Sequence, residues 1–144
     1  NDLLRTEWRN NAGELHRADG PAIISSNSDR EWRCSGKLHR ADGPALELAD
    51  GYREWHLDGK LHRIDGPSIE DPNGTRYWHQ FGVLHRLDGP AVELSSGSQY
   101  WYRNGKLHNE SGPAEVHTNG FRDWWLNGKF YTEAEWERIV FNMK

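Results

Sequence analysis

Large apolar side chains return at a constant interval along an otherwise polar chain. Tryptophan occupies positions 23 residues apart, at Trp32, Trp55, Trp78, Trp101 and Trp124, with Trp8 one residue out of phase before them. Aliphatic residues keep the same interval at Ile23, Leu46, Ile69 and Val92. A period of about 20 to 50 residues indicates that one small structural unit is stacked on copies of itself. The fold is therefore set by a single repeat.

One repeat, residues 38–60, predicts a β-hairpin. It holds two short stretches of strand-forming residues, 45–48 and 52–57, on either side of the turn dipeptide Asp50-Gly51. A second turn dipeptide, Asp58-Gly59, ends the repeat, and the other copies carry equivalent turns. The pattern predicts an all-β fold, an elongated repeat sheet of stacked hairpins. At about 4.8 Å per strand, such a sheet would be of order 50 Å long.

The heptapeptide Leu-His-Arg-x-Asp-Gly-Pro connects one hairpin to the next. It begins at Leu15, Leu38, Leu61 and Leu84, and at Leu107 it decays to Leu-His-Asn-Glu-Ser-Gly-Pro. Proline restricts φ and glycine adopts conformations that other residues resist, so the segment is expected to be a loop. The string His-Arg-x-Asp also occurs in kinase catalytic loops. An active site is built once, however, so a motif present four times indicates scaffold.

The arginine and the aspartate of this loop are lost together. In the decayed copy Asn109 and Ser111 replace them, whereas His108 remains. This joint loss predicts that the two side chains pair, either with each other or across adjacent repeats. The expected structural pairs are Arg17 with Asp19, Arg40 with Asp42, Arg63 with Asp65, and Arg86 with Asp88.

The tryptophans are expected to form the core together with the loop leucines and the aliphatic positions, because large apolar anchors supply most of the area that a stacked repeat can bury. Alternation along a strand places the residue two positions before each tryptophan on the same side, where its guanidinium could stack on the indole. These residues are Arg30, Arg53, Arg76, Gln99 and Arg122.

The residues that flank each tryptophan should point to the opposite side of the sheet. They are charged in the early repeats and become aromatic in the later ones. Clustered exposed aromatic side chains usually mark a contact surface. The candidate binding residues are Tyr52, Tyr77, His79, Tyr100, Tyr102, Phe121 and Trp125.

The end of the chain predicts a helix. Thr132 and Glu135 form a capping box, and apolar residues follow at helical spacing. The expected organisation is a hairpin array over residues 1–131, with about five full repeats and a partial first one, as stacked-repeat periodicity requires. A helix over residues 132–144 should cap the last hairpin, since repeat arrays need a terminal cap.

Composition narrows the classes of partner. The 18 basic and 22 acidic residues give a net charge of −4 and alternate along the chain, so neither a nucleic-acid footprint nor a basic membrane patch is expected. No apolar run is long enough to span a membrane. The one cysteine, Cys34, excludes an internal disulfide framework and is compatible with a cytoplasmic location.

Catalytic and metal chemistry find no support. The chain has no GxSxG, P-loop, HExxH or GxGxxG motif. The histidines of the repeat are His16, His39, His62, His85 and His108. At about 10 Å spacing they cannot converge on one metal ion, so each is expected to bond within its own loop. We expect no enzyme, no cofactor and no metal.

The repeat resembles the MORN repeat, a family of β-hairpins with an aromatic residue before a Gly-Lys turn. The matching residues include Trp55, Gly59, Lys60 and His62, and the resemblance covers residues 5–130. Arg63 stands where the family has glycine, and Asp65-Gly66-Pro67 has no close counterpart. The resemblance implies a non-catalytic sheet used for binding. The variant is similar to repeats of phage and bacterial proteins, some of them antitoxins, which implies an inhibitor.

Three functions follow as hypotheses. The first is a module for protein–protein interaction in the cytoplasm of a bacterium or a phage-infected host cell, acting as an inhibitor. The second is sequestration of a small aromatic or nucleotide ligand between aromatic rings and arginine. The third is a purely structural or oligomerisation module, so the number of copies stays open.

Overall fold

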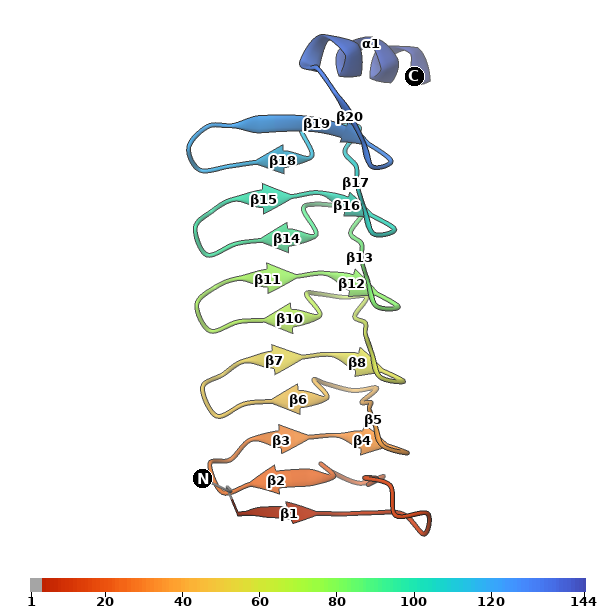
Figure 1. The fold of residues 1–144 in the computed structure, drawn as a ribbon, viewed down its shortest axis with the longest axis vertical. Coiled ribbons are helices and arrows are strands. Elements are labelled where there is room, and N and C mark those ends of the chain that lie inside the picture. Colours follow the sequence, from red (N-terminus) through yellow and green to blue (C-terminus); the bar gives the residue numbers. More distant parts are fainter. Residues whose placement is uncertain (1–3) are drawn as a thin grey trace. The chain divides into compact units, whose positions relative to one another are not determined.

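The computed structural model describes residues 4–144 and divides into two compact units, Asn1–Pro72 (unit 1) and Asn73–Lys144 (unit 2). Both units consist of β-hairpins in antiparallel sheets whose strand orders are linear, so neither sheet closes on itself. Within residues 4–144 one helix, at the C-terminal end, completes the fold (Figure 1). The predicted all-β class with a C-terminal helix is confirmed.

The main sheet of unit 1 has the strand order β1-β2-β3-β6-β7-β10. Its strands are β1 (Arg5–Glu7), β2 (Ile23–Ser25), β3 (Arg30–Glu31), β6 (Leu46–Glu47), β7 (Arg53–Glu54) and β10 (Ile69–Glu70). Smaller hairpins lie beside it. They are formed by β4 (Arg33–Cys34) with β5 (Lys37–Leu38), and by β8 (His56–Leu57) with β9 (Lys60–Leu61).

Unit 2 repeats this arrangement with the strand order β11-β14-β15-β18-β19-β20. The strands are β11 (Arg76–Tyr77), β14 (Val92–Glu93), β15 (Gln99–Tyr100), β18 (Glu115–Val116), β19 (Arg122–Leu126) and β20 (Lys129–Tyr131). The small hairpins are β12 (His79–Gln80) with β13 (Val83–Leu84), and β16 (Tyr102–Arg103) with β17 (Lys106–Leu107). Helix α1 (Glu133–Met143) follows β20, and the predicted capping box of Thr132 and Glu135 is present.

The tryptophans before Trp124 mark the points where the chain leaves the strands of the main sheet for the next hairpin. The N–H of Trp55 donates to the carbonyl of Ser68 in the main sheet (2.8 Å), and its carbonyl accepts from the N–H of His62 beyond the small hairpin (2.9 Å). The expected single strand over residues 52–57 is therefore wrong. It is two strands, β7 and β8, because the backbone changes partners at Trp55. Equivalent bonds occur at Trp8, Trp32, Trp78 and Trp101.

The small hairpins close through two-residue turns with left-handed backbone. Asp58 and Gly59 have φ of 50° and 80°, and Asn104 and Gly105 have 51° and 76°. Two consecutive positive φ values are those of a type I′ turn, which matches the twist of the flanking strands. Asp, Asn and Gly tolerate this conformation better than other residues, so the turn dipeptides noted in the sequence are explained.

The strand register places the aliphatic positions on the face away from the tryptophans. Leu46 pairs directly with Glu31 and Glu54, so these three side chains share one face. The other face carries Glu70, and the Arg63 guanidinium contacts both Glu70 and the Trp55 ring. The expected packing of the aliphatic positions around the tryptophans is therefore wrong. Ile23, Leu46, Ile69 and Val92 pack between flanking residues on the opposite face.

The most completely buried side chains are small. The residue that follows each loop proline is 0 % exposed, whereas the tryptophan rings are half-buried. Ala45 shows why: its carbonyl accepts from the Trp32 N–H and its own N–H donates to Glu54, so it lies between neighbouring hairpins on the tryptophan side. A small side chain fits this enclosed position between two hairpins. These buried residues are Ala22, Ala45, Ser68, Ala91 and Ala114.

Candidate functional site

The loop arginines cover the tryptophan rings. The Cζ atom of Arg40 lies 4.0 Å from the centroid of Trp32, and that of Arg86 lies 4.1 Å from the centroid of Trp78. The same contact joins Arg17 to Trp8 and Arg63 to Trp55. A guanidinium at this distance is attracted by the quadrupole of the indole.

The rest of each guanidinium is held inside its own loop. Arg63 Nε donates to Asp65 Oδ1 at 3.0 Å, and Nη1 donates to the Pro67 carbonyl and to Glu70 Oε1, each at 3.1 Å. Arg17, Arg40 and Arg86 bond in the same way to their own Asp and Pro. Each Arg–Asp pair is thus formed within one loop. The hydrogen bond from Arg63 lowers the pKa of Asp65 below its ordinary value.

The arginines two positions before the tryptophans do not cover the rings. Arg53 lies on the tryptophan side, as alternation predicts, but its Nη1 approaches Glu70 at 4.0 Å. For Arg30, Arg53 and Arg76 the expected stacking is wrong because the loop arginine of the same repeat already occupies the ring. Alternation along a strand predicts on which side of the sheet a strand residue lies. It cannot predict that a loop residue, such as Arg63, folds back onto the tryptophan ring.

The repeat histidines bond to the following repeat. His39 Nδ1 accepts from the N–H of Asp58, and His85 Nδ1 accepts from the N–H of Asn104, in each case at the small turn one repeat further on. His16 and His108 make the same bond. The expected bonding within the histidine's own loop is therefore wrong for His16, His39 and His85. It is confirmed for His108, whose Nε2 also contacts Glu110 Oε1 of the same loop at 3.0 Å. These imidazoles join consecutive repeats and are accounted for as structure.

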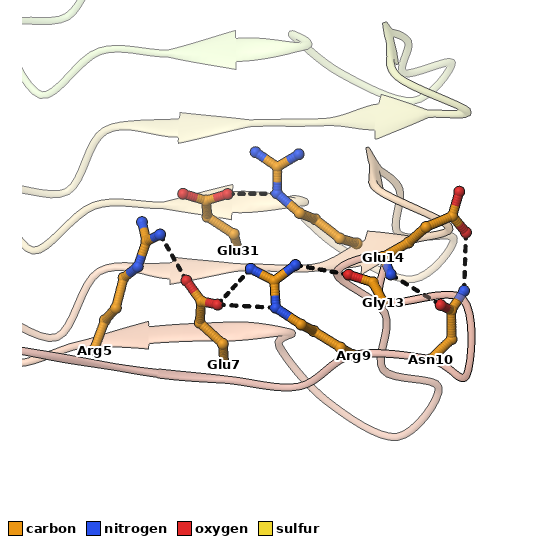
Figure 2. Close-up of polar contacts among 8 residues, drawn as sticks. Arg5, Glu7, Arg9, Asn10, Gly13, Glu14 and Glu31 are labelled. Atoms are coloured by element: carbon orange, nitrogen blue, oxygen red, sulfur yellow. Dashed lines mark hydrogen bonds and ion pairs between the residues drawn. The ribbon is translucent and has the colours of Figure 1, made fainter.

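The face opposite the tryptophans carries the candidate binding residues, and in unit 1 it is self-paired. Figure 2 shows Glu7 held by Arg9, which also donates to the Gly13 carbonyl. One repeat further on, Arg33 Nε donates to Glu31 at 2.7 Å. In the third repeat Glu54 contacts His56 Nε2 at 2.7 Å and accepts from the Tyr52 hydroxyl at 2.6 Å. Tyr52, a predicted binding residue, is thus held by a carboxylate of its own strand.

In unit 2 the same face is aromatic. The Tyr100 ring meets His117 edge to face with centroids 5.4 Å apart, and His117 meets Phe121 at 5.8 Å. Trp125 meets Phe130 at 5.5 Å. Phe121 is 58 % exposed and Phe130 is 50 % exposed. We call this surface the aromatic face of unit 2; it comprises Tyr77, His79, Tyr100, Tyr102, His117, Phe121, Trp125 and Phe130.

Two carboxylates lie within the aromatic face. Glu115 is the direct cross-strand partner of both Tyr100 and Asp123. Its Oε2 accepts a hydrogen bond of 3.1 Å from Trp125 Nε1. Burial raises the pKa of Glu115, and the charge of Asp123 and a hydrogen bond with Asp123 raise it further. The hydrogen bond from Trp125 and the charge of His117 lower it, but the net shift is upward. Burial and the charge of Glu115 likewise raise the pKa of Tyr102.

Sequence reasoning placed most of the aromatic residues but missed Glu115, His117 and Phe130. Glu115 and His117 belong to the first strand of a hairpin and to its tip, and only the cross-strand register brings them beside Tyr100. Phe130 lies in β20, which was not assigned as a strand. The available signal was the alternation of residues 115–117, which puts Glu115 and His117 on one side of a strand.

The pH dependence of stability tests the environment of Glu115. Its pKa in the folded protein is raised above the ordinary 4.5, so its stabilising effect is complete below pH 4.5 and is lost as the pH rises through the folded-state pKa. The glutamine of Glu115→Gln does not ionise, so this variant lacks the pH-dependent contribution of Glu115 while the other titrating groups are the same. We expect wild type to lose stability relative to Glu115→Gln between pH 4.5 and neutral pH, measured by urea denaturation. A relative gain over the same interval would contradict this environment.

Residues 4–144 contain no group of three or more His, Cys, Asp or Glu side chains arranged to hold a metal ion. The helix in this part of the chain is too short and too polar to cross a membrane. A scan of protein-family models and a search of curated proteins each found no match to this chain.

Proposed function

We propose that this protein is a non-enzymatic repeat module, built of MORN-like hairpins, that binds a protein partner through the aromatic face of unit 2. The observation that carries the proposal is the set of contacting rings on one sheet face, in which Phe121 and Phe130 are half exposed or more and the other rings are partly exposed. Leaving such rings in water forfeits the free energy of burying them. Aromatic residues are also those that dominate the energy of protein interfaces.

The contrast between the two units supports this proposal. At the equivalent positions of unit 1, Glu7 bonds to Arg9 and Glu31 bonds to Arg33. Partly exposed carboxylates that already have an ion-pair partner give little free energy to an interface. Unit 2 has replaced them with rings, which offer a partner a large apolar area at a low cost in side-chain entropy.

The repeated motif itself supports a binding role over a catalytic one. Its arginine is used to cover a tryptophan and its histidine to join repeats, so the residues that could suggest chemistry already have structural tasks. The likeness of the repeat to phage and bacterial proteins favours an inhibitor that acts in the cytoplasm of a bacterium or an infected host cell. That part of the proposal rests on resemblance.

A second candidate is sequestration of a small aromatic ligand. The edge-to-face rings of Tyr100 and His117 and the hydrogen-bonded indole of Trp125 favour it, because a flat ligand could stack beside them. Native mass spectrometry of protein purified from a bacterial host separates the two candidates. A released small molecule supports sequestration, and a stoichiometric protein supports the first proposal. A self-associated chain would identify the oligomerisation module.

Replacing the two exposed phenylalanines tests the binding face. We expect Phe121→Ser with Phe130→Ser to lower the affinity for the partner found by mass spectrometry at least about tenfold, because two anchors of the interface lose their apolar area. The melting temperature should change little, since both rings are about half exposed or more in the free protein. Phe141→Ser is the matched control, because Phe141 is 79 % exposed on helix α1, outside the aromatic face. Equal loss of binding in the control, or no loss in the double variant, would reject the proposed surface.

A further inference from the structure

Glu115 and Asp123 of the aromatic face have no ion-pair partner in the described part of the chain, whereas the carboxylates on the same face of unit 1 do. In unit 1 the residue two positions after each such carboxylate is basic: Arg9 follows Glu7, Arg33 follows Glu31 and His56 follows Glu54, each in contact with its carboxylate. In unit 2 the equivalent carboxylate is Asp123, and the residue two positions after it is Trp125. Glu115 stands where Leu46 stands in unit 1, between two residues that precede tryptophans, and the residue two positions after it is His117. Within residues 4–144 no Lys, Arg or His nitrogen lies in ion-pair range of Glu115 or Asp123.

This arrangement brings negative charge and aromatic rings to one place. Glu115 and Asp123 face each other across β18 and β19, with Tyr100 on the other side of Glu115. The Trp125 indole is fixed beside them by its bond to Glu115. His117, whose charge acts on Glu115, has its ring packed against Tyr100 and Phe121. Burial makes this charge pair costly in the free protein, so a cation from outside would relieve it.

We infer that the protein partner presents an arginine or lysine side chain to Glu115 and Asp123, with Tyr102 and Trp125 lying against its aliphatic stem. This inference rests on the proposed protein-binding function and specifies the partner as a basic segment. Paired carboxylates bind a guanidinium or an ammonium through charge-assisted hydrogen bonds. Indole and phenol rings add cation–π attraction and apolar contact. The occupant would supply to Asp123 the ion pair that Arg33 supplies to Glu31 in unit 1.

Titration with a short peptide tests the inference without the natural partner. The probe is acetyl-Gly-Arg-Gly-amide, and its citrulline counterpart keeps the size while removing the charge. We expect the arginine peptide to shift the NMR signals of the Trp125 amide and indole N–H groups in a saturable manner. The citrulline peptide should bind at least about tenfold more weakly, because the charge-assisted hydrogen bonds are lost. Equal binding of the two peptides, or no saturable shift with the arginine peptide, would overturn the inference.

Two variants connect the signal to the carboxylates. Glu115→Gln with Asp123→Asn should reduce binding of the arginine peptide at least about tenfold, since both charges are removed while Gln can still accept from the Trp125 indole. Glu31→Gln is the matched control, because Glu31 occupies an equivalent position but is already paired with Arg33. Retained peptide binding by a folded double variant would overturn the inference, and near-UV circular dichroism shows that it is folded.

Measuring how tightly each variant binds the protein partner distinguishes failure of this inference from failure of the proposed function. If the carboxylate variant binds the partner as tightly as wild type while Phe121→Ser with Phe130→Ser does not, the basic segment is rejected and the binding face stands. If both variants bind as wild type does, the binding face itself is rejected. If the carboxylate variant loses the partner and Glu31→Gln keeps it, the basic segment is supported.

Discussion

Arg63→Ala is expected to lower the free energy of unfolding by about 2 to 3 kcal/mol, because one guanidinium makes a cation–π contact and several charge-assisted hydrogen bonds. Its Cζ lies 4.0 Å from the Trp55 centroid, and its nitrogens bond to Asp65, the Pro67 carbonyl and Glu70. Arg63→Lys should recover only part of the loss, since an ammonium cannot stack as a plane and bond in several directions at once. Urea denaturation followed by tryptophan fluorescence measures both effects.

Two variants of neighbouring residues serve as controls for Arg63. Arg53→Ala removes an arginine on the same side of the sheet that is 51 % exposed and makes one loose contact with Glu70, at 4.0 Å. The free energy of unfolding should therefore change by no more than about 0.5 kcal/mol. Asp65→Ala should also cost little, because the Asp65 side chain is 85 % exposed. A larger loss for Arg53→Ala than for Arg63→Ala would contradict the assignment of the loop arginine as the cover of the tryptophan.

Gly66→Ala is expected to lower the free energy of unfolding by about 1 to 3 kcal/mol through overpacking. A Cβ at this position would stand 2.8 Å from Arg63 Cζ and 3.0 Å from its Nε. The guanidinium would have to leave the ring and its hydrogen bonds to make room. Because the backbone of Gly66 is not left-handed, the cost comes from this contact alone, and Gly66→Ala should be nearly neutral in an Arg63→Ala background.

The decayed repeat provides the matched control for the glycine. At Gly112 the nearest atom to an added Cβ is Asn109 Nδ2 at 3.8 Å, an ordinary contact. Gly112→Ala should therefore leave stability unchanged, or raise it by a few tenths to about 1 kcal/mol because alanine restricts the unfolded chain. Equal destabilisation by Gly66→Ala and Gly112→Ala would show that the loop backbone, not the arginine, requires glycine.

The decayed loop shows how one side chain replaces another. Asn109 Nδ2 donates to the Pro113 carbonyl at 2.9 Å, which is the bond that Arg63 makes to Pro67. The Asn109 carbonyl in turn accepts from the indole of Trp136 on helix α1 at 2.9 Å. Asparagine thus keeps the hydrogen bond that shapes the loop, without covering the tryptophan, in the repeat that contacts the helix.

Much of the fold could be derived from the order of the residues alone. The 23-residue period, the turn dipeptides and the capping box predicted hairpins, their turns and the helix, because each depends on backbone preferences of a few adjacent residues. The pairing of Arg63 with Asp65 could be predicted as well, because the two residues are only two positions apart. The alternation of residues around each tryptophan also indicated which side chains point away from it.

Contacts between residues further apart in the sequence were decided by the tertiary structure. His39 bonds to a turn 19 residues further on, and Arg40 returns through its loop to cover Trp32. Neither contact follows from alternation, because the chain changes hydrogen-bond partners at Trp32 and strand periodicity ends there. The register of β18 against β15 and β19 likewise placed Glu115 between Tyr100 and Asp123. Local preferences determined the repeat, whereas stacking of one repeat on the next determined the face it offers to a partner.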